Sequence, residues 1–150
     1  MKVYEFGREH ANVFAMFQCA VEPWWVFKAS AEEMAKAYHV YLFIADGHDE
    51  LGTEFVSLEK YARDAAAYLR AQGIERVDAM YGVSMGGATV LMASGKELPK
   101  NVVGVLADCG FSSPKKIIKK CAGDLKLPAE LLYPFIKLGA KLYGHFDLEE

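Results

Sequence analysis

The residues best suited to chemistry are a serine between two glycines, in the sequence Gly-Val-Ser-Met-Gly at residues 82–86. A strand-like run at residues 77–81 precedes it, and a helix-like run at residues 85–95 follows it. A serine at a sharp turn between a strand and a helix projects its hydroxyl from the carboxyl end of the sheet. The pattern therefore predicts that Ser84 is a nucleophile. The alternative is a glycine-rich turn that only closes the strand–helix unit.

The backbone next to this serine is suited to hold negative charge. Met85 is expected to begin the helix, and the N-terminus of a helix carries partial positive charge. Its N–H should point to the same side as the Ser84 hydroxyl, where the oxygen of an attacked carbonyl would become an oxyanion. The sequence therefore predicts Met85 as an oxyanion-binding residue.

Five apolar runs alternate with helix-like segments along the chain. The expected strands are residues 3–6, 13–17, 40–44, 77–81 and 102–107, and the continuous apolar runs are typical of buried parallel strands. The expected helices are residues 30–38 with Ser30 as N-cap, 57–73, 85–95, 114–121, and 128–143 with an interruption at Pro134. This alternation predicts an α/β sandwich of three layers with a mostly parallel sheet.

The chain resembles the α/β-hydrolase family. The resemblance is carried by Phe17-Gln18-Cys19-Ala20, Asp46-Gly47-His48-Asp49, and Tyr81-Gly82-Val83-Ser84-Met85-Gly86-Gly87. It covers nearly the whole chain but only the amino-terminal part of the family's fold, so we expect one truncated domain over residues 1–150. Residues 112–150 resemble the start of a lid region. The resemblance implies an esterase-like serine hydrolase, with Ala20 as the second oxyanion-binding residue.

In the family, an acid and a histidine follow later strands, and this chain has no matching positions. His48 follows the strand at residues 40–44, at the same end of the sheet as Ser84, and is the candidate base. Because some family members place the acid after the strand next to the serine strand, Asp108 is the candidate that orients it. The alternatives are an exposed loop histidine and an aspartate that caps a loop. His145 could fold back to the serine instead.

Two functions from different classes remain open. The first is a carboxylesterase that acts on a small-molecule ester, with activity impaired by the missing acid and histidine. The second is a non-catalytic fragment, pseudoenzyme or engineered chimera that folds and self-associates. A flavodoxin-like nucleotide binder fits less well, because the glycines surround a serine on a later strand rather than forming a phosphate loop after the first.

Composition limits the partners that we expect. The chain has 150 residues and a net charge of −3, which does not favour a nucleic-acid partner. It has no apolar run long enough for a membrane span and no start typical of a signal peptide. Its three scattered cysteines fit a reducing cytoplasm and lack zinc spacing, so no metal or cofactor is expected. We expect a homo-oligomer, formed through the exposed sheet edge at residues 102–107 or the apolar carboxyl-terminal helix.

Overall fold

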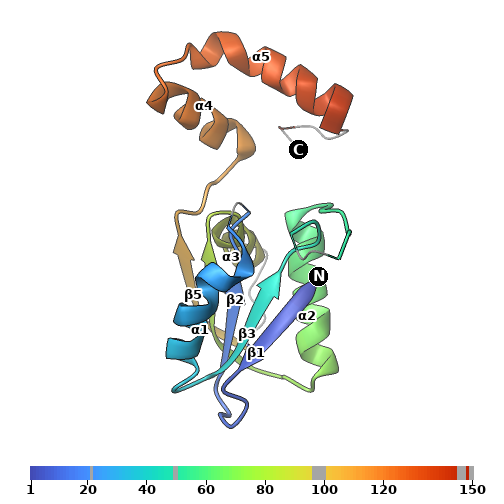
Figure 1. Ribbon diagram of the computed structural model, residues 1–150, viewed down its shortest axis with the longest axis vertical. Coiled ribbons are helices and arrows are strands. Elements are labelled where there is room, and N and C mark those ends of the chain that lie inside the picture. Colours follow the sequence, from blue (N-terminus) through green and yellow to red (C-terminus); the bar gives the residue numbers. More distant parts are fainter. Residues whose placement is uncertain (21, 49–50, 96–100, 145–147, 149–150) are drawn as a thin grey trace. The chain divides into compact units, whose positions relative to one another are not determined.

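The computed structural model describes residues 1–20, 22–48, 51–95, 101–144 and 148 (Figure 1). The chain divides into two compact units, Met1–Gly110 and Phe111–Glu150. The first unit contains the sheet and the serine, and the second is helical. The boundary falls next to residue 112, where the lid-like segment is expected to begin. That this segment forms a lid stays a prediction.

The first unit is built on a five-stranded sheet with the strand order β1-β3-β2-β4-β5. The strands are β1 (Lys2–Phe6), β2 (Val13–Phe17), β3 (His39–Ile44), β4 (Val77–Val83) and β5 (Val102–Asp108). β1 runs antiparallel to β3, and the other neighbours are parallel. The predicted mostly parallel sheet is therefore confirmed.

Helices cover both faces of the sheet (Figure 1). α1 (Lys28–Met34) packs on one face, whereas α2 (Leu58–Ala71) and α3 (Met85–Gly95) pack on the other. All five residues of β2 are buried, because this strand lies inside the sheet and between both helix layers. The predicted three-layer arrangement is confirmed.

The starts of the helices follow the predicted caps only in part. Ser57 caps α2 as expected, since its side chain accepts a hydrogen bond from the Lys60 amide at 3.1 Å. The prediction that Ser30 caps a helix at residues 30–38 is wrong. A 3-10 helix, η1 (Trp24–Phe27), runs directly into α1, and the Lys28 amide donates to the Trp25 carbonyl. The preceding turn thus provides the hydrogen-bond acceptor for the first amide of α1, and Ser30 lies inside the helix.

The second unit contains α4 (Pro114–Asp124) and α5 (Ala129–Gly139), which continues as a π-helical segment, η2 (Ala140–Gly144). The predicted interruption at Pro134 does not occur, because α5 continues through this residue. A proline inside a helix lacks one backbone donor, and the helix here tolerates that loss. Within the residues that the model describes, no helix has both the length and the apolar character that a membrane span requires.

The connection between β4 and α3 brings backbone segments into direct contact. A Cβ atom added to Gly82 would lie 2.1 Å from the Gly86 carbonyl oxygen. One added to Gly86 would lie 2.1 Å from the Phe17 carbonyl oxygen, at the end of β2. These distances are far below van der Waals contact. Glycine at both positions therefore lets the strand, the helix and the end of β2 meet.

We expect Gly86→Ala to lower the free energy of unfolding by about 1–3 kcal/mol or more, because the added methyl group overlaps backbone that cannot rotate away. Urea unfolding followed by circular dichroism measures this change. Gly95→Ala is the matched control on the same helix, since no atom lies within 4 Å of its added Cβ. Equal stability of Gly86→Ala and the parent chain would contradict the close approach.

Candidate active site

Ser84 lies at the turn between β4 and α3 with a φ of 52°. Few residues other than glycine adopt this left-handed conformation, which stores backbone strain. Two hydrogen bonds hold it: the Ser84 amide donates to the Asp108 carbonyl at 2.9 Å, and the Ala88 amide donates to the Ser84 carbonyl at 2.9 Å. The Ser84 hydroxyl has no hydrogen-bond partner among the described residues. The turn thus fixes the backbone and leaves the hydroxyl available.

Two amides of the predicted oxyanion site are unpaired. Within the described ranges, neither the Met85 nor the Ala20 N–H donates to a backbone or side-chain acceptor. Met85 is the first residue of α3, and Ala20 lies in the loop after β2. The contact between Gly86 and the Phe17 carbonyl brings that loop to the start of α3. The structure therefore brings the start of this loop, at Phe17 and Gln18, to the turn that carries Met85.

The loop after β2 is braced by Gln18, a residue whose role the sequence did not indicate. Its side chain is only 1% exposed. The Gln18 amide donates to the Phe43 carbonyl at 3.2 Å, and its Nε2 atom donates to the Glu22 carbonyl at 2.5 Å. Its Oε1 atom is buried without a partner among the described residues. These bonds fix the loop at both ends, on either side of Ala20.

His48 follows β3 and bonds within its own loop. Its amide donates to the Ala45 carbonyl at 3.1 Å, and its Nδ1 atom lies 3.1 Å from the Asp46 carbonyl oxygen. Because a carbonyl only accepts, Nδ1 carries the proton in this contact and Nε2 keeps its lone pair in the neutral ring. His48 has no hydrogen bond to Ser84. β2 separates β3 from β4, a spacing of about 10 Å between the two strands.

Charged groups hold the loop that carries His48. The Asp46 carboxylate pairs with the Met1 amino group and with Lys60 Nζ, the latter at 3.1 Å. The Met1 amino group has the largest effect, and Lys60 adds to it, so the pKa of Asp46 lies below its usual value. Lys60 also pairs with Asp64 at 2.5 Å on α2. The loop is thereby tied to the helix next to it.

Asp108 ends β5, the strand next to β4. Its backbone carbonyl accepts from the Ser84 amide, whereas its carboxylate accepts from the Cys109 thiol at 3.2 Å. Asp108 and His48 are not hydrogen-bonded, because two strands separate the ends of β3 and β5. The structure thus joins Asp108 to the serine through the backbone but does not assemble a Ser84–His48–Asp108 triad.

The other histidines do not approach the serine in the described part of the chain. His39 pairs with Val13 in the sheet register, at the amino ends of the strands, and contacts Glu5 Oε2 at 3.3 Å. His10 lies before β2 and pairs with Glu9. His145 falls outside the described residues. Among the residues described, no three His, Cys, Asp or Glu side chains gather as a metal-ligand set.

The carboxylate of Asp108 makes the Cys109 thiol a weaker nucleophile than an ordinary exposed cysteine. The hydrogen bond to Asp108 raises the pKa of Cys109, and the negative charge of the carboxylate raises it further. We therefore expect Asp108→Asn to lower this pKa and to speed alkylation of Cys109 by iodoacetamide at neutral pH, because the thiolate is the reactive form. Mass spectrometry of the modified residues measures the rate.

The exposed Cys121 on α4 is the internal control for this experiment, and its alkylation rate should stay constant. Slower or unchanged modification of Cys109 in Asp108→Asn would contradict the effect that we assign to the carboxylate.

No protein-family model matches the sequence, and no curated protein matches it. Solved structures do match the fold. A protein from Desulfitobacterium hafniense, described as belonging to the α/β-hydrolase family, has 22% identity and a TM-score of 0.66, over 81% of this chain and 51% of that one. A lipase-esterase related protein from Clostridium acetobutylicum has 21% identity and a TM-score of 0.64, over 87% and 56%.

A monoacylglycerol lipase from Paleococcus ferrophilus has 22% identity and a TM-score of 0.64, over 83% of this chain and 51% of that one. The chain thus spans about half the length of these structures. At this level of identity, the likeness concerns the fold. The chain has an α/β-hydrolase fold.

Proposed function

We propose that this chain is a serine hydrolase of carboxylic esters, with Ser84 as the nucleophile. The observation that carries the proposal is the conformation of Ser84. This residue lies between β4 and α3 with a φ of 52°, and its hydroxyl has no partner among the described residues. Strain of this kind is common at functional sites, where it presents a reactive group. The structural neighbours include a monoacylglycerol lipase and a lipase-esterase related protein, which supports an ester as substrate.

In the proposed reaction, the Ser84 oxygen attacks the ester carbonyl carbon, and the carbonyl π electrons move to the oxygen. The Met85 and Ala20 amides donate hydrogen bonds to that oxyanion. The base takes the Ser84 proton, the oxyanion re-forms the carbonyl double bond as the bond to the alcohol oxygen breaks, and the alcohol leaves with that proton. Water, deprotonated by the same base, then attacks the acyl-serine, and the serine oxygen leaves with the proton as the acid is released. Because the oxyanion site uses backbone donors, Gln18 and Cys19 need only hold the loop in place.

His48 is the proposed base, and Asp108 is the proposed acid that stabilises its protonated form. The contact of Nδ1 with the Asp46 carbonyl supports the first role, since it leaves Nε2 as the proton acceptor. Catalysis then requires the His48 loop to move toward the serine when substrate binds, as catalytic hydrogen bonds often tighten only in the complex. The position of Asp108, at the end of the strand paired with β4, supports its proposed role.

Labelling with a fluorophosphonate probe tests the proposal. We expect the probe to modify the folded chain at Ser84 and not to modify Ser84→Ala. His48→Ala should slow labelling by about 10²–10⁴-fold, because the serine loses its base. His10→Ala, which changes a histidine before β2, should label at the parent rate. An unlabelled folded chain, or equal labelling of Ser84→Ala, would refute Ser84 as the nucleophile.

A second candidate is a non-catalytic, self-associating protein, and the surface of β5 favours it. In the described part of the chain, β5 pairs only with β4 and forms one edge of the sheet. Val103 is 60% exposed and Leu106 is 53% exposed. Leu106 also lines a groove of about 420 Å³ between α1 and the β4–β5 side of the sheet. An apolar free edge favours pairing with a strand of another chain.

We expect the protein to be a dimer by size-exclusion chromatography with light scattering, with a second copy paired at β5. Leu106→Lys should shift it to a monomer, because the charge disfavours strand pairing at the edge. Leu125→Lys is the control, since it changes a leucine that is also exposed but lies after α4. A monomeric parent chain would refute self-association. A dimer lost only in Phe135→Lys would assign it to α5 instead.

A further inference from the structure

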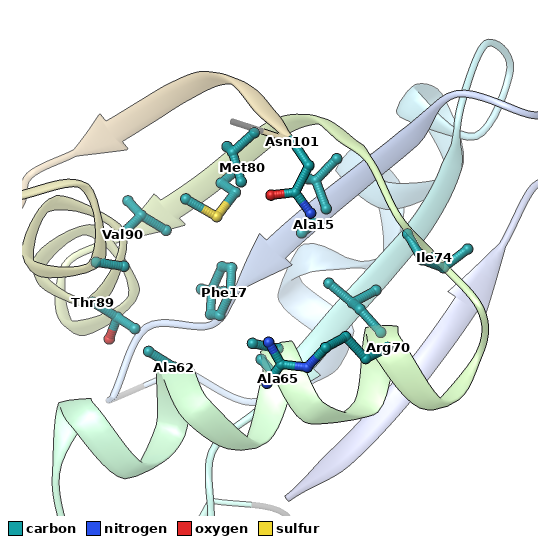
Figure 2. A pocket seen from close by; sticks show the side chains of 15 residues that line it. Ala15, Phe17, Ala62, Ala65, Arg70, Ile74, Met80, Thr89, Val90 and Asn101 are labelled. Carbon is teal, nitrogen blue, oxygen red and sulfur yellow. The ribbon is translucent and has the colours of Figure 1, made fainter. Parts of the chain in front are cut away.

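A cavity of about 200 Å³ lies between the sheet and the helices α2 and α3 (Figure 2). Its walls begin at Val77 and Val102, the first residues of β4 and β5, and include Phe17 at the end of β2. Ser84 lies at the opposite end of β4 and does not line the cavity. The space therefore belongs to a site other than the serine turn.

Small side chains create this space. The lining includes five alanines: Ala15 on β2, Ala62, Ala65 and Ala66 on α2, and Ala93 on α3. The α2 alanines share one face of the helix with Leu69, since they are spaced by three and four residues. A methyl group at each of these positions leaves room that a leucine would fill. The cavity is thus a consequence of the helix face that α2 presents to the core.

Arg70 is the one charged residue that lines the cavity among the described residues. Figure 2 shows its side chain reaching back along α2 toward Ala65. Its guanidinium makes no hydrogen bond or ion pair with the described residues. The polar neighbours are already engaged: the Thr89 hydroxyl donates to the Met85 carbonyl at 2.9 Å, and Asn101 Nδ2 donates to the Glu75 carbonyl at 2.7 Å. The guanidinium therefore remains available to an anion.

We propose that this cavity binds a monocarboxylic acid with an unbranched apolar chain, with the carboxylate at Arg70. Apolar walls accept a hydrocarbon, and an apolar cavity of about 150 Å³ is known to bind benzene, so this one has room for about six to eight carbon atoms. A guanidinium pairs with a carboxylate through two parallel hydrogen bonds. With one cation at its rim, the cavity does not suit a polyanion such as a nucleotide.

Calorimetric titration with octanoate and with octanol tests the two halves of the site. The parent chain should bind both. Arg70→Gln should weaken octanoate by about tenfold and leave octanol unchanged, because only the acid pairs with the guanidinium. Ala66→Leu should weaken both ligands by at least about tenfold, since the larger side chain occupies the space.

Three control measurements separate binding in this cavity from binding elsewhere on the chain. Arg63→Gln removes an exposed arginine of the same helix that does not line the cavity, and it should bind octanoate at the parent affinity. Ser84→Ala should also retain octanoate binding, which distinguishes the cavity from a product site at the serine. Thermal unfolding should show that Ala66→Leu is folded. Arg70→Gln removes the charge without filling the cavity, so it tests the carboxylate contact separately from the space. No octanoate binding by the parent chain, or octanoate binding at the parent affinity by Arg70→Gln and Ala66→Leu, would overturn the proposal.

Discussion

The structure depends on the close approach of three backbone segments at the start of α3. Gly82 at the end of β4, Gly86 on α3 and the carbonyl of Phe17 on β2 meet without room for a Cβ atom. This contact sets the direction in which the chain leaves the sheet, and the positive φ of Ser84 follows from that sharp change of direction. It also fixes where the loop after β2 begins. One packing constraint therefore sets the position of Ser84, of the Met85 amide and of the start of the loop that carries Ala20, which are the proposed nucleophile and oxyanion donors.

The proposed base is held by interactions of a different kind. His48 lies in a loop that depends on ion pairs of Asp46 with the Met1 amino group and Lys60, and on the contact with the Asp46 carbonyl. Such partly exposed pairs are weak compared with backbone packing in a core. A loop held in this way is displaced more easily than the closely packed serine turn. In the proposed reaction, the more tightly packed part of the site would stabilise the oxyanion, and the loop held by ion pairs would carry the proton.

The sequence predicted the elements whose physical signal is local. Apolar runs such as residues 40–44 specify buried strands, and Ser57 before a helix specifies a cap. The prediction failed at Ser30, because a serine before acidic residues indicates a cap even where none is needed. Here the preceding 3-10 helix already leads into α1, and Ser30 lies inside the helix. The hydrogen bonds of Gln18 could not be predicted from the sequence, since they depend on where Phe43 and Glu22 lie after folding. The cavity could not be predicted either, because an alanine on the buried face of α2 has the same sequence pattern whether or not a neighbouring side chain fills the space beside it.

The Asp108 carboxylate connects the serine turn with the charge around it. Asp108 joins Ser84 through a backbone carbonyl, so its position is fixed by the pairing of β4 with β5. From there its carboxylate keeps the Cys109 thiol protonated, and so lowers its reactivity. The same negative charge would favour a protonated histidine near the serine, because an opposite charge stabilises the imidazolium. The carboxylate at the end of β5 thus lowers the reactivity of the Cys109 thiol, and in the proposed reaction it would also stabilise a protonated His48.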